Sequence, residues 1–122
     1  MKVRIIQSKL SPDIVRGIMI DEFGDMAKVD VDIERGVLTI GGEWHSEGQD
    51  ELVEKGSDGS KVWGCNYYAF REPEKRIEYN SLINIKPGIG HTSMDVKEND
   101  VKEKMKNIIE LLLLSSDETI QR

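Results

Sequence analysis

Apolar and polar side chains alternate along residues 27–34, and this alternation restricts the possible folds more than any other feature of the chain. Side chains at every second position of a strand point to the same face, so residues 27–34 are predicted to form a half-buried strand. A glycine-containing turn at residues 35 and 36 separates it from a second alternating segment, residues 37–45. Together the two segments predict an antiparallel hairpin that needs a hydrophobic layer against one face.

The register of this hairpin follows from keeping its apolar side chains on one face. We pair Glu34 with Val37 across the turn, since a slip by one residue would mix the two faces. The resulting core-facing pairs are Ile33 with Leu38, Val31 with Ile40, and Ala27 with Trp44. On the other face Lys28 meets Glu43. Glu43 and His45 are therefore expected to point away from the core.

Residues 47–55 are predicted to form a short helix directly after this hairpin. Ser46 is expected at its N-cap, because the Ser46 hydroxyl can accept a hydrogen bond from the first turn while Gln49 reaches back to the Ser46 amide. Gly56 is expected to end the helix in a left-handed conformation. Only two residues of the helix are apolar, so it must lie against the sheet to be stable.

Residues 61–70 and 76–84 are predicted to form a second hairpin, joined by a proline-containing loop. Its register is set by pairing Phe70 with Arg76. The core-facing pairs are then Trp63 with Ile83, Cys65 with Ser81, Tyr67 with Tyr79, and Ala69 with Ile77. The opposite face carries Asn66 with Asn80 and Tyr68 with Glu78, with Asn84 farther along. Asparagine is depleted in strands, so this polar face is unusual.

The remaining segments predict one more strand and two more helices. Residues 1–7 suit a short strand, and Ser11 is expected to cap a helix that Gly24 ends. Gly17 weakens that helix unless it allows close approach to a neighbouring strand. Asn99 is expected to cap the last helix, which is followed by a polar tail that is predicted to fray.

Residues 108–114, at the end of the last helix, contain more apolar side chains than one buried stripe requires. Leu111, Leu113 and Leu114 form the excess. This excess predicts a homodimer through the C-terminal helix, or else a helix that is buried on two sides by its own chain.

Together these elements predict an α+β fold with one domain, residues 1–114, and a polar C-terminal tail, residues 115–122. The order is βαββαββα, with a mainly antiparallel sheet and helices packed on one face, the apolar one. The crossover after the first strand favours parallel pairing or insertion beside the second hairpin. A ferredoxin-like arrangement with an added strand and helix is therefore one permitted topology.

Charge and composition narrow the partners and the location. The net charge of −6 and the pI near 5.0 disfavour a nucleic-acid-binding surface, which is usually basic. One cysteine cannot form an internal disulfide, which favours a reducing cytoplasm. The longest apolar run is far shorter than the roughly 20 residues that a membrane span needs, so no membrane association is expected.

Four sequence motifs occur in a recognisable order: FGDMAKVDVDIERGVLTIGGEWH, LVEKGS, VWGCN and IEYNSLINIKPG. In this order they resemble the short, uncharacterised prokaryotic proteins catalogued as domain of unknown function 5674. The resemblance extends over residues 3–113. It implies no substrate, cofactor or catalytic residue, so the function has to be inferred from the side chains.

One surface of the two hairpins is predicted to hold a site for a small polar ligand. The candidate residues are Glu43, His45, Asn66, Glu78 and Asn80, with His91 approaching from a glycine-rich loop. Their convergence requires the two hairpins to be neighbours; otherwise the residues are separate surface features. The favoured function is a small cytoplasmic ligand-binding or interaction domain, and one alternative is a structural homo-oligomeric subunit.

Glu43 and His45 also suggest a divalent metal ion, because carboxylate and imidazole groups are common metal ligands. Such a site would support a metal-assisted hydrolytic enzyme. The simpler interpretation is an ion pair of Glu43 with Lys28 beside a solvated histidine. Cys65 with His45 could form a thiol nucleophile and its base, but the alternation places Cys65 among the core side chains.

Overall fold

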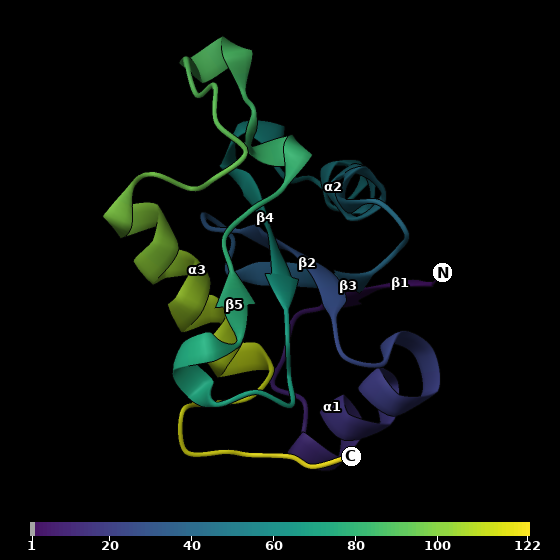
Figure 1. The fold of residues 1–122 in the computed structure, drawn as a ribbon. Helices are drawn as coiled ribbons and strands as arrows, with labels where there is room; N and C mark the ends of the chain where they lie inside the picture. The colour runs from purple at the N-terminus through teal and green to yellow at the C-terminus, as the bar shows by residue number, and fades with distance from the viewer. Residues whose placement is uncertain (1) are drawn as a thin grey trace.

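A five-stranded antiparallel sheet lies at the centre of the computed structural model, which describes residues 2–122 (Figure 1). Its strands are β1 (Val3–Ile6), β2 (Ala27–Asp32), β3 (Val37–Gly41), β4 (Val62–Tyr67) and β5 (Ile77–Glu78). The α-helices are α1 (Pro12–Ile18), α2 (His45–Glu54) and α3 (Asn99–Leu112). The predicted α+β class and the order βαββαββα are confirmed. Met1, where the first strand was expected to begin, lies outside the described residues.

The strands lie side by side in the order β1-β3-β2-β4-β5. β2 pairs with both β3 and β4, so the two predicted hairpins are neighbours in one sheet. β1 pairs antiparallel with β3, and its predicted parallel pairing or insertion beside the second hairpin is wrong. β1, β3 and β2 keep the split βαβ arrangement of a ferredoxin-like fold. A complete ferredoxin-like fold would place β4 at the outer edge of β1. Here β4 pairs with β2 instead, so the fold is not complete.

The register of the β2-β3 hairpin differs from the prediction by two residues. Asp32 pairs with Val37, where Glu34 was expected. The turn is longer because Asp32 Oδ1 accepts hydrogen bonds from the amides of Glu34 and Arg35, each 2.9 Å long. Since the shift is an even number, the side chains of both strands stay on their predicted faces.

The second hairpin is shifted by the same amount and is much shorter than predicted. β4 and β5 pair only Asn66 with Glu78 and Tyr67 with Ile77. The predicted pairs farther along the hairpin, such as Cys65 with Ser81, are therefore wrong. A 3₁₀ turn, Leu82–Asn84, replaces the predicted end of the second strand, and another, Pro87–Ile89, lies in the loop that follows.

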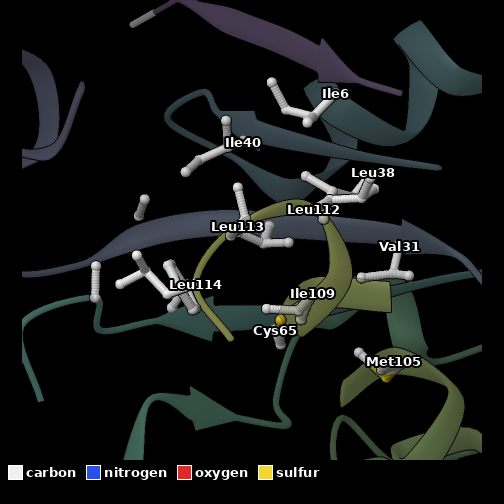
Figure 2. Packing of buried hydrophobic residues seen from close by; sticks show 14 of the residues in the cluster. Ile6, Val31, Leu38, Ile40, Cys65, Met105, Ile109, Leu112, Leu113 and Leu114 are labelled. Atoms are coloured by element: carbon white, nitrogen blue, oxygen red, sulfur yellow. The ribbon is translucent and has the colours of Figure 1, made fainter. Parts of the chain in front are cut away.

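The apolar face of the sheet packs against α3 in the hydrophobic core (Figure 2), to which α1 contributes Val15. The buried side chains that α3 contributes are Val101, Met105, Ile109 and Leu112. Leu113 and Leu114 continue into the same core, whereas Leu111 is 67% exposed. The apolar run is thus largely used within its own chain, and the homodimer stays a prediction with Leu111 as its main remaining support.

The ends of α1 follow the sequence closely, whereas α3 begins one residue earlier than predicted. Ser11 caps α1 as predicted, with its Oγ accepting a hydrogen bond from the Ile14 amide. Gly24, at φ 72°, follows a π-helical turn that extends the helix, Met19–Phe23. A Cβ at Gly17 would meet no described atom within 4 Å, so the predicted close approach of a strand is wrong. Glu98 rather than Asn99 occupies the N-cap of α3.

The helix α2 covers the opposite face of the sheet, which corrects the prediction that all helices share the apolar face (Figure 1). Its Gly48 lies directly on the side chains of Asp30 and Thr39. A Cβ built on Gly48 would lie 2.3 Å from both Asp30 Oδ2 and Thr39 Oγ1. The missing side chain allows the helix backbone to pack against a polar sheet face.

The cap of α2 also differs from the prediction. Trp44 rather than Ser46 is the N-cap residue, so the helix begins at His45. Glu47 Oε1 accepts hydrogen bonds from the amides of Glu43 and Trp44, each 2.9 Å long. As a result β3 ends at Gly41, and neither Trp44 nor His45 belongs to the strand.

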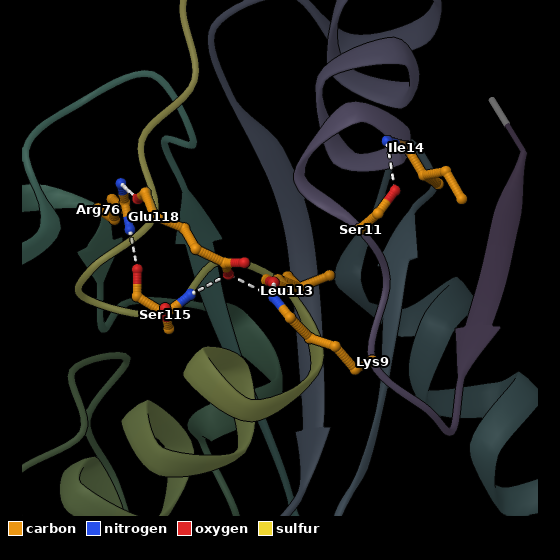
Figure 3. Close-up of polar contacts among 7 residues, drawn as sticks. All are labelled: Lys9, Ser11, Ile14, Arg76, Leu113, Ser115 and Glu118. Atoms are coloured by element: carbon orange, nitrogen blue, oxygen red, sulfur yellow. Dashed lines mark hydrogen bonds and ion pairs between the residues drawn. The ribbon is translucent and has the colours of Figure 1, made fainter.

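The C-terminal tail, residues 115–122, is bound to the domain, and the prediction that it frays is wrong (Figure 3). Arg76 donates from Nη1 to the Ser115 carbonyl over 3.0 Å and from Nη2 to the Glu118 carbonyl over 2.5 Å. Lys9 Nζ donates to Glu118 Oε1 over 2.5 Å. Ile120 is buried in the main hydrophobic cluster. One apolar side chain and one buried arginine therefore anchor a mostly polar segment.

Candidate functional site

A groove of about 310 Å³ opens where the first turn of α2, the polar face of β2 and β4, and the segment after β5 meet. We call it the α2 groove. Its lining residues are Lys28, Trp44, His45, Ser46, Asn66, Asn80, Ser81, Leu82, Ile83 and Met94. Because β2 and β4 are paired, side chains from both predicted hairpins reach it.

Two asparagines of the second hairpin supply amide groups to the α2 groove. Asn66 Nδ2 donates to Glu78 Oε1 over 2.7 Å, and Asn80 Nδ2 donates to Asp95 Oδ1 over 2.5 Å. The carboxylates fix the orientation of both amides, because a carboxylate only accepts hydrogen bonds. Each amide oxygen is left as an acceptor on the other branch of its side chain.

His45 stands at the start of α2, and its ring is held by the neighbouring strand. The ring Nε2 lies 2.8 Å from the Cys65 carbonyl oxygen. Since a carbonyl only accepts, Nε2 carries the hydrogen, and Nδ1 is the acceptor of the neutral ring. Burial lowers the pKa of His45 below its usual value, the hydrogen bond to Cys65 opposes this shift, and the nearby charge of Lys28 adds to it. The neutral imidazole is therefore favoured near pH 7.

Large apolar side chains form the outer walls of the α2 groove. Trp44 is 61% exposed, Leu82 is 64% exposed and Met94 is 39% exposed. Side chains of this size are usually buried, and their grouping around one hollow is typical of a contact surface for another molecule.

A glycine in β4 allows the segment after β5 to cross the sheet and form the floor of the groove. A Cβ at Gly64 would lie 2.7 Å from Ser81 Oγ, so any side chain there would exclude the crossing segment. Asn84 then replaces the missing strand partner. Its Oδ1 accepts from the Gly64 amide over 2.8 Å, and its Nδ2 donates to the Gly64 carbonyl over 3.0 Å. A glycine inside a strand pattern is the sequence signal of such an approach.

The six predicted site residues are divided between three places. The groove is lined by His45, Asn66 and Asn80, and Glu78 adjoins it through the hydrogen bond to Asn66. Glu43 lines a separate cavity of about 210 Å³ that also contacts Lys28. The sequence-based set did not include Lys28, Trp44 or the apolar walls, since these follow from the position of α2.

His91 lies away from the α2 groove, beside another cavity of about 300 Å³. Its Nδ1 donates to the Asn84 carbonyl over 2.7 Å, and its Nε2 lies 3.1 Å from Glu98 Oε1. Its ring packs edge-on against Trp63, with ring centroids 5.0 Å apart. The predicted approach of His91 to the other five residues is therefore wrong, because its ring is held beside Trp63 near the start of β4.

The metal and thiol hypotheses depend on groups that the fold separates. Glu43 and His45 no longer share a strand, so the spacing that put them side by side does not apply. Across residues 2–122, no three histidine, cysteine, aspartate or glutamate side chains are grouped so that they could hold a metal ion. The Cys65 thiol is buried, and burial raises its pKa. His45 contacts the carbonyl of Cys65 rather than its thiol.

The fold and the α2 groove together define the class of protein: a small α+β domain with a groove between the start of α2 and the polar face of the sheet. The chain belongs to the family described as "Protein of unknown function (DUF5674)", whose sequence model matches residues 4–112. The resemblance inferred from the four motifs is thus confirmed. No curated protein and no solved structure shows a significant match. In the described part of the chain no helix is long and apolar enough to cross a membrane.

Proposed function

We propose that the protein is a small-ligand-binding module whose ligand occupies the α2 groove. The observation that carries this proposal is the pairing of β2 with β4, which brings Lys28 and Asn66 together opposite the first turn of α2. Ligand sites are usually hollows of about 300–1,000 Å³ with apolar walls and a few fixed polar groups. A groove of about 310 Å³ is at the lower end of this range and suits a small metabolite.

The polar groups of the groove are oriented before any ligand arrives. Asn66 and Asn80 are held by carboxylates, and His45 is held by a backbone carbonyl. Fixed side chains lose little conformational freedom on binding, which favours affinity. The exposed walls formed by Trp44 and Leu82 would be covered by an apolar part of the ligand.

The two tryptophans provide the test. Trp44 lines the α2 groove, whereas Trp63 lines the cavity beside His91. Small-molecule fragments would be screened by two-dimensional NMR of the ¹⁵N-labelled protein, which resolves the two indole signals. We expect binding fragments to shift the Trp44 indole and the amides of Ser46 and Asn66. Shifts confined to Trp63 would move the site to the cavity beside His91 and contradict the proposal.

A matched pair of variants checks the position of the ligand. Leu82→Ser removes an exposed wall of the groove, and Leu111→Ser makes the same change at a similarly exposed position of α3. We expect Leu82→Ser to weaken fragment binding roughly fivefold to tenfold, because it removes apolar contact area. Leu111→Ser should leave the affinity unchanged. Equal affinities in both variants would contradict the assignment of the groove.

The proposed location is the cytoplasm, because the single thiol, Cys65, is free and buried. A reducing compartment does not select for disulfides. Fractionation of source cells, followed by detection of the protein, checks this assignment.

A further inference from the structure

Resting on the proposed function, we infer that the ligand of the α2 groove carries a carboxylate that pairs with Lys28, attached to an apolar body that packs on Trp44 and Leu82. The first support is the charge of the lining. Lys28 and His45 are its titratable side chains, and no aspartate or glutamate belongs to it. In a chain with 23 acidic residues and a net charge of −6, a lining with a cation and no acid selects for an anion.

Among the residues that the structure describes, Lys28 has no ion-pair partner. Its side chain is half-buried. The ion pair with Glu43 that the sequence suggested is absent from residues 2–122, although both residues border the smaller cavity. A partly buried ammonium group gains from a hydrogen-bonded anion, since partly desolvated charges are stabilised by pairing.

The acidic groups around Lys28 do not replace that anion. Asp30 lies on the same strand face, but burial raises its pKa well above the usual value, which disfavours its charged form. Glu78 and Asp95 are exposed and accept hydrogen bonds from Asn66 and Asn80. Water and salt screen exposed charges, so their effect on a ligand beside Lys28 is small.

The same groove is poorly suited to a phosphate group. Phosphate sites usually combine several cations or the free amides of a helix start. Here the Glu47 carboxylate, which accepts hydrogen bonds from the amides of Glu43 and Trp44, places a negative charge at the start of α2 and repels a phosphate. Lys28 supplies one positive charge, which matches an anionic group with one negative charge. A carboxylate satisfies this requirement, while the amide oxygens of Asn66 and Asn80 remain available to ligand donors.

Four aromatic probes of similar size and different charge test the inference: phenylacetate, phenylacetamide, phenethylamine and phenyl phosphate. Their dissociation constants would be measured by NMR titration from the Trp44 indole signal. We expect phenylacetate to bind roughly tenfold more tightly than phenylacetamide, as a charge-assisted hydrogen bond allows. Phenethylamine and phenyl phosphate should bind more weakly than phenylacetate.

Variants of Lys28 link the preference to one side chain. Lys28→Gln should weaken phenylacetate binding roughly tenfold and leave phenylacetamide binding unchanged. Lys28→Arg should keep the preference for the acid. Lys55→Gln makes the same charge change at an exposed residue outside the groove and should alter neither affinity. The NMR spectrum of each variant shows whether the fold is intact.

The outcomes separate the two proposals. Equal affinities for the acid and the amide, with Trp44 shifting, would overturn the carboxylate inference and keep the groove as a ligand site. Tighter binding of phenyl phosphate or phenethylamine would likewise replace the carboxylate by a phosphate or a cation. No shift of Trp44 with any of the four probes would overturn the proposed function and the inference with it.

Discussion

Asp30 lies on a strand face that the alternation assigns to solvent, yet only 2% of its surface is exposed. It is buried because α2 packs on it at Gly48. Its Oδ1 atom has no hydrogen-bond partner among the described residues. Burial raises the pKa of Asp30 well above the usual value, while hydrogen bonds from Gln49 and Thr39 and the charges of two lysines oppose the shift.

The first prediction concerns the pH dependence that follows from Asp30. A carboxyl whose pKa is raised in the folded state binds more protons there than in the unfolded state, so stability is lost as the pH rises through the folded pKa. Below about pH 4, near the unfolded pKa, the group is neutral in both states. Asp30→Asn should therefore raise the free energy of unfolding by roughly 1–3 kcal/mol near pH 7 and by almost nothing near pH 4.

Urea denaturation at several pH values between about 4 and 8 measures this difference. Asp50→Asn, at an exposed position of α2, is the control and should not change the pH dependence. A constant difference between Asp30→Asn and the parent over this range would show that the carboxyl is ionised in the folded protein at every pH tested.

At the scale of elements, two helical glycines have opposite roles. Gly48 sets the distance between α2 and the sheet, because its α-carbon faces Asp30 and Thr39 directly. Gly17, in α1, faces open space. Judged by residue type alone, both glycines destabilise their helices by the same amount, because the destabilisation comes from backbone entropy.

The second prediction therefore uses the same substitution at both positions. Gly48→Ala should lower the free energy of unfolding by roughly 1–3 kcal/mol, because the new methyl group forces α2 away from the sheet. Gly17→Ala should raise it by about 0.5–1 kcal/mol, because alanine favours the helix and nothing obstructs its side chain. Thermal and urea denaturation measure both. A stabilising Gly48→Ala would contradict the close packing of α2.

At the scale of the whole molecule, the tail after α3 runs along the bottom of the view in Figure 1, from the end of α3 to a position beside α1. Arg76, only 3% exposed, gives hydrogen bonds to carbonyls of the tail and to the Arg71 carbonyl. Ile120 inserts into the core, which also contains residues of α1 and the strands. The tail therefore holds distant parts of the chain together.

The third prediction tests whether the tail belongs to the folded domain. Ile120→Ala should lower the free energy of unfolding by about 2 kcal/mol, as for other large-to-small changes in a core. Thr119→Ala, at the exposed neighbouring position, should change it by less than about 0.5 kcal/mol. Urea denaturation of both variants decides the point. Similar values for the two would mean that the tail contributes little.

Much of the fold could be predicted because the rules involved are local. Alternation places Val29 and Val31 in the core, and because strand faces repeat every two residues, this survives a register error of two. The cap at Ser11 and the stop at Gly24 depend on hydrogen bonds and dihedral angles within one turn. For the candidate site, the same two-residue repeat correctly predicts that Asn66 lies on the polar face of β4.

Only the tertiary structure decided where the groove is and what lines it. Trp44, whose amide donates to Glu47, is the N-cap of α2 in place of the predicted Ser46, and this puts His45 at a helix start rather than in a strand. The side of the sheet that α2 covers depended on the contact of Gly48 with Asp30, residues that are distant in the sequence. Hydrophobic periodicity predicts that a polar face is exposed to water. It cannot show that such a face is buried beneath a second layer that is itself mostly polar.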